Sequence, residues 1–576
     1  RLDINKSSAW SKPYGGLTVL RTPVYRPGDC LFRIHGDPAA QGVHFNFAGS
    51  VAAQIPAATT RLYTAAFIIV LVVLLAIAIF VGVNQTVKNS GYQERHTVAV
   101  QIGDHSLSNA ELNYYFFDAV NTFYSSYGSY AGMFGLDTSK PLDQQVTDEE
   151  TGRTWADDFL ESAKETARND YAMSDAAEAA GFTLPEDKAA ELEQNLASID
   201  TYAKLYGFQS GKAYLKAMYG NGATEEGFRE YSTRRTLADA YYANYSDSLT
   251  YTDDQIAGKD AEDPKVYSSY SYHAYYMAIS KFRTGGTTDA DGNTTYTDAE
   301  NAAAEAALRA AAESLVSDEI DSPEALDAAI AALSINADEE SAASTASTNI
   351  RYYSLNSAYQ DWVSDSSRKA GDKKVFESTT TNDDGTESLS GCYVVYYDGS
   401  TDNEFPMVNV RHILVKPAHP TDEAEDAHTD DETYSAEEWA AAKASAEEIY
   451  NQWKSGEATE DSFAALANEK SDDGDGTTGG LYQNVTPGQM VQAFNDWCFD
   501  SSRKSGDTGI VETQYGYHVM YFVGTSDITY RTSLIESDLR SADVAAWQEE
   551  MINALTITDG DTSYIRTDLV INANGQ

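Results

Sequence analysis

A twelve-residue segment occurs twice in this chain. Residues 361–372 read Asp-Trp-Val-Ser-Asp-Ser-Ser-Arg-Lys-Ala-Gly-Asp, and residues 496–507 repeat nine of these twelve residues. Such a repeat predicts two copies of one module, which we assign to residues 265–405 and 406–527. The second copy has a histidine near each end, His412 and His518. The first copy has no histidine at the matching closing position, so only the second copy has the side chains for chemistry.

Both copies have the pattern of a compact α+β module, with helices between a first and a last strand. For the second copy we expect strands at Val408–Lys416 and His518–Val523, and helices at Ala436–Lys454, Asp461–Glu469 and Pro487–Phe499. For the first copy we expect strands at Tyr270–Ile279 and Cys392–Tyr397, and an alanine-rich helix at Ala302–Leu315. Cys392 and Cys498 fall in different copies and are expected to be buried free thiols.

An uncharged apolar run, Leu62–Val83, precedes the modules. Its 22 residues would reach about 33 Å as a helix, enough to cross a bilayer. About sixty residues precede it, which is unlike a cleaved signal peptide. We therefore expect a retained single-pass anchor in the cell membrane.

Residues 84–264 are expected to form a helical segment. Amphipathic helices are predicted at about 155–181, 185–204, 210–219 and 224–246, and Ser108 precedes Glu111 at the spacing of a capping box. The tail, residues 528–576, contains one more helical stretch, Ser533–Leu555, that has no partner in the second copy. We expect this helix to pack back onto the helical segment.

Charge limits the classes of partner. The chain carries a net charge of −49, which suits solubility and argues against nucleic-acid binding, because that needs a basic surface.

Six short elements of residues 406–525 occur in an order that resembles the parvulin-type peptidyl-prolyl cis/trans isomerases. They are Val410-Arg-His-Ile-Leu-Val415, Phe463-Ala-Ala-Leu-Ala467, Ser471-Asp-Asp473, Gly479-Gly-Leu481, Gly488-Gln-Met-Val491 with Phe494, and Thr513-Gln-Tyr-Gly-Tyr-His518. Together with the anchor, the helical segment and the tail, the layout resembles the PrsA/SurA-like extracytoplasmic foldases. The resemblance implies that residues 1–61 lie in the cytoplasm and the C-terminal bulk on the extracytoplasmic side. One departure is that Gly480 runs directly into Leu481, where parvulins commonly have an additional residue.

The resemblance implies a set of site residues. His412 and His518 would form a pair of imidazoles, Asp473 would lie beside them, and Thr513 would hydrogen-bond the pair. Leu481, Met490 and Phe494 would line an apolar socket for the substrate proline. No cofactor and no metal are implied. The implied partners are unfolded or partly folded exported polypeptides that contain X–Pro bonds.

The first copy is expected to be a degenerate module. Alignment of the repeated segments places Tyr393 opposite His518, and the opening strands match best with Met277 near His412. Two other functions stay open at this point. One is a catalytically inactive holdase chaperone that uses the parvulin fold only for binding, and the other is a structural cell-surface adhesion protein.

Overall fold

The computed structural model describes residues 89–571 except 291, 338–341, 383–384, 420–433 and 475. The expected anchor Leu62–Val83 and residues 1–61 lie outside this part of the chain. Among the helices that the structure does describe, none is both long and apolar enough to span a membrane.

The N-terminal unit is a group of helices on a small sheet. Its helices are α2 (Tyr92–His96), α3 (Asn109–Tyr127), α4 (Trp155–Ala179), α5 (Glu186–Leu205), α6 (Gly211–Tyr219), α7 (Glu225–Ser248) and α8 (Asp253–Glu262). The short 3₁₀ helices are η1 (Gly128–Phe134), η2 (Leu142–Gln144) and η3 (Pro264–Tyr267), and β3 (Val146–Asp148) pairs with β4 (Arg153–Thr154). The predicted helices are confirmed to within a few residues. The Ser108 hydroxyl accepts the Glu111 amide at 3.2 Å and caps α3 as expected.

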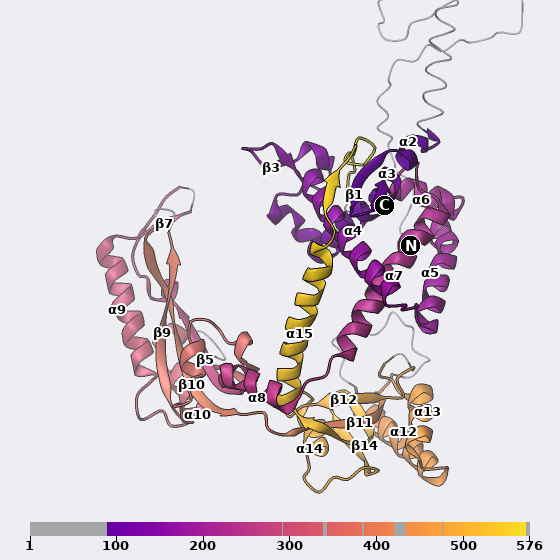
Figure 1. The fold of residues 1–576 in the computed structure, drawn as a ribbon. Coiled ribbons are helices and arrows are strands. Elements are labelled where there is room, and N and C mark those ends of the chain that lie inside the picture. Colours follow the sequence, from indigo (N-terminus) through magenta and orange to yellow (C-terminus); the bar gives the residue numbers. More distant parts are fainter. Residues whose placement is uncertain are drawn as a thin grey trace, which may run out of the picture.

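The C-terminal tail returns to this unit, as predicted. Helix α15 (Tyr530–Asn553) extends as a column from the junction of the two modules to the helical unit (Figure 1). There Trp547 stacks on Tyr245 with the ring centroids 3.9 Å apart. Strand β15 (Ile557–Asp559) then pairs antiparallel with β1 (Val98–Ile102), which also pairs with β2 (His105–Ser108). The two ends of the described chain therefore close one three-stranded sheet.

Both copies of the module have the same antiparallel sheet. In the first copy the strand order is β8 (Thr345–Arg351), β5 (Ser269–Ala278), β10 (Glu387–Thr401) and β9 (Lys373–Thr381). In the second copy it is β12 (Leu481–Val485), β11 (Pro406–Val415), β14 (Gly516–Thr529) and β13 (Thr508–Thr513). The duplication predicted from the sequence is thus present in the fold.

Helices cover both faces of each sheet. In the second copy α12 (Ala436–Ser455) and α13 (Glu460–Lys470) pack on one face, and α14 (Gln492–Cys498) packs on the other. In the first copy α9 (Asp298–Ser314) and α10 (Pro323–Ala331) lie opposite the short α11 (Gln360–Val363). The remaining short elements of the first copy are η4 (Ile279–Phe282), η5 (Ser334–Asn336), η6 (Tyr352–Ser354) and the pair β6 (Thr287–Thr288) and β7 (Thr294–Thr295). Cys392 and Cys498 are both buried and unpaired, as expected.

One predicted helix is shorter than expected. The sequence pattern indicated a helix over Pro487–Phe499, but α14 begins only at Gln492. Gly488 has φ +83°, a left-handed conformation that interrupts a right-handed helix. Residues 486–491 therefore form a loop that leads into α14.

The repeated twelve residues encode one turn. In the first copy the Gly371 amide bonds the Tyr397 carbonyl at 2.8 Å, and in the second copy the Gly506 amide bonds the Phe522 carbonyl at the same distance. In the second copy the Arg503 guanidinium lies 4.0 Å from the centroid of the Trp497 ring. In the first copy Arg368 lies over the Trp362 ring in the same way, at 5.1 Å. In both copies this turn joins the short helix to the following strand, α11 to β9 and α14 to β13, which accounts for the nine repeated residues.

The strand registers correct one part of the alignment between the copies. Tyr393 pairs with Phe376 as His518 pairs with Val511, so Tyr393 does occupy the place of His518. His412 pairs with Met520, and the corresponding pair in the first copy is Ala274 with Val395. Met277 pairs with Cys392 and is three residues away from that position. The prediction that Met277 stands near His412 was therefore wrong, and the equivalent residue is Ala274.

Candidate active site of the second module

The two histidines expected in the site lie side by side on neighbouring strands. His412 is on β11 and His518 on β14, and their Nδ1 atoms are 3.1 Å apart. Both lie on the same face of the sheet, because His412 is paired with Met520, two residues from His518. Exposure is only 2% for His412 and 6% for His518. A contact this short between two buried imidazoles requires that one Nδ1 donates a proton to the other.

A chain of hydrogen bonds runs through this pair. The Thr513 Oγ1 atom is 2.9 Å from His518 Nε2, and His412 Nε2 is 3.1 Å from the Asp473 Oδ2 atom. The Tyr482 hydroxyl donates to the same Oδ2 at 2.6 Å. The carboxylate accepts only, so His412 donates from Nε2. If both imidazoles are neutral, His518 then donates from Nδ1 and accepts at Nε2 from the Thr513 hydroxyl, which also lies 3.3 Å from the Gly516 carbonyl. In this order all four ring nitrogens of the two imidazoles have a partner.

The pKa directions agree with that order. Burial lowers the pKa of His412, with Asp473 acting in the opposite direction. Burial, and then the neighbouring His412, lowers the pKa of His518 to about 4. The Tyr482 hydrogen bond lowers the pKa of Asp473, and burial raises the pKa of Tyr482 to about 12. At neutral pH the site therefore combines two neutral imidazoles with one carboxylate.

The loop with Asp473 is attached to the edge of β11. The Ser471 hydroxyl accepts the amides of Leu414 at 3.1 Å and Asp473 at 3.2 Å, and the Asp472 amide bonds the Leu414 carbonyl at 2.9 Å. On the same strand the His412 amide bonds the Gly480 carbonyl at 2.9 Å. Gly480 has φ +65°, and a Cβ there would lie 2.1 Å from the His412 carbonyl oxygen, so no other residue fits. Two loops on one edge of β11, with β14 paired along the other edge, thus fix the position of His412.

Aromatic and apolar side chains surround the imidazoles. The Phe494 ring lies edge-on to both, with centroids 5.5 Å from His412 and 5.3 Å from His518. The Tyr482 ring is 4.6 Å from His412. Met490 is partly exposed and packs against the apolar cluster that contains Phe494 and Met520. The exposed end of the network is Asp473, whose side chain is 36% exposed. Asp473 is therefore the part of the network that is open to solvent, while the imidazoles lie buried behind the aromatic side chains.

The structure brings together six of the seven residues expected in the site. Leu481 is the exception: it pairs with Arg411 on β11, so it faces the opposite side of the sheet from His412. Tyr482 pairs with Val410 and takes the expected place of Leu481 on the side of the histidines. Tyr482 and Ser471 were not predicted as site residues. The loop after Gly480 is one residue shorter than is common in parvulins. Because side chains alternate between the two faces of a strand, this deletion moves Tyr482 to the face where the residue before it was expected.

The same region of the first copy is filled by aromatic side chains. Tyr359 is in the place of Phe494 by the twelve-residue repeat, and its ring lies 5.5 Å from Tyr393 and 5.4 Å from Tyr272. Ala274 offers only a methyl group where His412 stands. The first copy therefore has the fold of the second and none of its imidazole chemistry.

Comparisons with known proteins point to one family. Residues 412–524 match the family model described as the rotamase, PPIC-type PPIase domain. Foldase protein PrsA 1 of Listeria monocytogenes is 29% identical over 197 residues, which are 33% of this chain and 55% of that protein. Foldase protein PrsA 1 of Listeria innocua is 31% identical over 166 residues, covering 27% of this chain and 47% of that protein. The chain thus spans about half the length of the curated relatives it matches.

Solved structures include similar proteins. The PrsA isomerase of Bacillus cereus has 24% identity and a TM-score of 0.17, with 27% of this chain and 50% of that chain covered. PrsA of Bacillus subtilis has 24% identity and a TM-score of 0.16, with 26% and 47% covered. The second module is a parvulin-type peptidyl-prolyl isomerase domain, carried by a chain that is similar to the PrsA foldases.

Proposed function

We propose that the protein is a foldase with peptidyl-prolyl cis/trans isomerase activity, and that its substrates are unfolded or partly folded exported polypeptides with X–Pro bonds. The observation that carries this proposal is the buried pair His412–His518, closed at one end by Thr513 and at the other by Asp473. The pair lies in the domain that matches the isomerase family.

Rotation about an X–Pro bond breaks no covalent bond. The barrier of about 18–20 kcal/mol comes from amide resonance, which is lost as the carbonyl rotates out of plane. A catalyst needs an apolar wall for the proline ring and polar groups that favour the twisted amide over the planar one. Met490, Phe494 and the Tyr482 ring supply the wall. The Asp473 carboxylate, with its protonation set by Tyr482 and the imidazole pair, is the polar group at the exposed end.

The helical unit is proposed to hold unfolded clients. Large apolar side chains are exposed on η1: Met133 is 82% exposed, Tyr130 65% and Phe134 52%. Beside them is a hollow of about 560 Å³, lined by residues that include Tyr124, Ala131 and Leu136. Exposed apolar patches of this kind mark sites of contact with other chains.

The remaining parts of the proposal concern placement. We propose that Leu62–Val83 is a membrane anchor and that the modules lie on the extracytoplasmic side. We also propose the domain limits 84–264, 265–405, 406–527 and 528–576.

Two assays on the full chain test these functions separately. A proline-limited refolding reaction should be accelerated by the wild-type chain and not by a His412→Ala, His518→Ala double variant. Light scattering of an aggregating client should be suppressed by both, because holding depends on the helical unit. A wild-type chain that suppresses aggregation without accelerating refolding would instead identify an inactive holdase.

A further inference from the structure

The two modules share a β-bulge with an asparagine in the same unusual conformation. In the first module two residues of β8, at 348 and 349, lie opposite Ser271, and in the second module two residues of β12 lie opposite Asn409. Asn349 and Asn484 both have φ 55°. Each backbone amide is bonded across the bulge, to the Ser271 hydroxyl at 3.0 Å and to the Asn409 side chain at 2.8 Å. The bulge is thus an inherited feature of the module.

In the first module this bulge reaches the second module. The Asn349 Nδ2 atom donates to the Pro487 carbonyl at 3.0 Å. The next residue, Gly488, has φ +83°, and a Cβ there would lie 2.9 Å from the same Nδ2 atom. A side chain at position 488 would therefore disturb the contact. Bulges are known to redirect side chains in this way.

The loop that receives this hydrogen bond carries part of the proposed socket. Pro487 belongs to residues 486–491, which include Met490 and lead into α14 with Phe494. From inside the module the loop is attached by the Gly488 amide, which donates to the Asn495 side chain at 2.6 Å. Asn349 is the attachment from outside. The loop is therefore held between its own helix and the first module.

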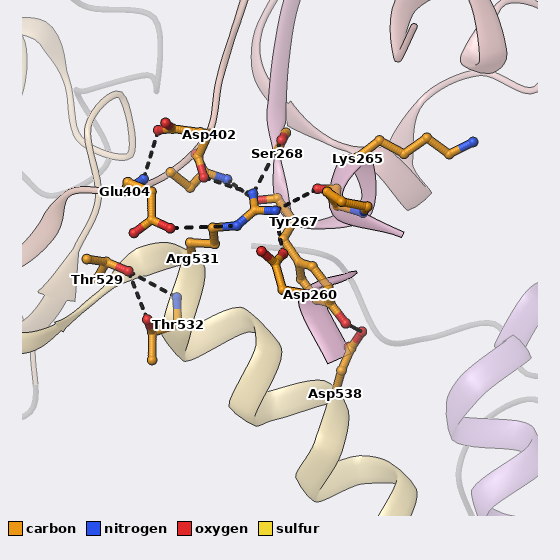
Figure 2. A network of polar contacts seen from close by, with 12 residues as sticks. Asp260, Lys265, Tyr267, Ser268, Asp402, Glu404, Thr529, Arg531, Thr532 and Asp538 are labelled. Atoms are coloured by element: carbon orange, nitrogen blue, oxygen red, sulfur yellow. Dashed lines mark hydrogen bonds and ion pairs between the residues drawn. The ribbon is translucent and has the colours of Figure 1, made fainter. Parts of the chain in front are cut away.

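A buried arginine keeps the two modules in this relation. Only residues 402–405 connect β10 to β11, and they lie against the start of α15 (Figure 2). Arg531, 6% exposed, donates to the carbonyls of Asp402 at 3.0 Å and Pro264 at 2.9 Å and pairs with Asp260 of α8. Its own amide bonds the Asn403 carbonyl at 2.9 Å. One cation thus ties α8, the connection and α15 together, and the short connection between the modules is held in place.

We propose that the first module is a brace for the substrate loop of the second, and that Asn349 is the positioning residue that delivers this effect. It acts through the Pro487 carbonyl on the placing of Met490 and does not touch the reacting amide. This inference rests on the proposed isomerase function. It also gives the inactive copy a role that does not depend on residual catalysis.

The test uses Asn349→Asp in the full chain. Aspartate has nearly the same shape and tolerates positive φ, but as a carboxylate it cannot donate to Pro487. Asn349→Gly keeps the backbone conformation and removes the side chain without adding a charge. The matched control is Asn382→Asp, in the hairpin between β9 and β10, where the amide donates to Thr386 within the first module.

Both Asn349 variants should raise KM for X–Pro peptides by about two- to fivefold, the worth of one exposed hydrogen bond, with kcat and Tm unchanged. Amide hydrogen exchange should become faster over residues 486–491 only, and the control should match wild type in both measurements. Wild-type KM and wild-type exchange in Asn349→Asp and Asn349→Gly would overturn the inference. An inactive wild-type chain would refute the proposed function instead, and the exchange measurement would still decide whether the brace exists.

Discussion

Acidification should destabilise the second module through His518. Burial and the adjacent His412 lower the pKa of His518 from 6.5 to about 4. A histidine whose folded pKa is depressed stabilises the fold fully above its unfolded pKa, because the unfolded chain binds the proton first as pH falls. With pKa values of 6.5 unfolded and about 4 folded, the free energy of unfolding should fall by about 2 kcal/mol between pH 7 and pH 5.

Two measurements check this prediction. Titration of the imidazole carbon-bound protons by NMR should give a His518 pKa well below 6.5. Denaturant unfolding at pH 7 and pH 5 should show a drop that is larger in wild type than in His518→Asn by about 2 kcal/mol, while the part common to both proteins comes from other titrating groups, including His412. A His518 pKa near 6.5, or the same pH dependence in both proteins, would refute the assignment of a neutral buried pair.

Three further predictions follow from single contacts. Tyr482→Phe removes the strongest influence that lowers the pKa of Asp473, so carbon-detected NMR should show that this pKa rises. Burial raises the pKa of the 3% exposed Asp170 carboxyl to about 6, so its charged form destabilises the helical unit at neutral pH. Asp170→Asn should therefore increase the free energy of unfolding, measured with denaturant, by roughly 1–3 kcal/mol at pH 7.5 and leave it unchanged at pH 3.5. Arg531→Met leaves Asp260 without its partner and should lower the free energy of unfolding by roughly 2–4 kcal/mol in the same assay, with part of the loss recovered by adding Asp260→Asn.

The duplication and the site motifs were predictable because they are encoded locally. Trp497, Arg503 and Gly506 make a turn whose bonds involve residues close in sequence or in the adjoining strand, so the same letters give the same structure twice. Likewise His412 and His518 are each fixed by the strand that contains them. The helical unit was predicted for a similar reason, since caps and apolar periodicity are local signals.

The errors come from sheet register, which is not local. A strand presents alternate side chains to opposite faces, so a shift of one residue exchanges the faces. Leu481 was placed in the socket from a motif one residue shorter than usual, and pairing with Arg411 puts it on the other face. The match of Met277 with His412 was wrong because the twelve-residue repeat aligns β9 and β10 with their counterparts in the second copy. It does not determine how β5 aligns with β11. The pairing of Ala274 with Val395, which corresponds to that of His412 with Met520, gives this alignment.

Contacts between the modules were also beyond sequence reasoning. Arg531 meets groups more than a hundred residues away along the chain, and Asn349 meets Pro487 across 138 residues. The individual residues carry no motif. Their roles follow from the position of α15 between the modules and the helical unit (Figure 1).

The central claim is that the second module catalyses isomerisation and the first does not. It is tested most directly by matched substitutions in the full chain, His518→Ala and Tyr393→Ala, since these residues occupy the same position in the two sheets. The cis/trans exchange rate of an X–Pro peptide, measured by NMR exchange spectroscopy with each purified chain, should fall by roughly tenfold or more in His518→Ala and stay at the wild-type level in Tyr393→Ala. Equal rates in the two variants, or a loss confined to Tyr393→Ala, would contradict the account.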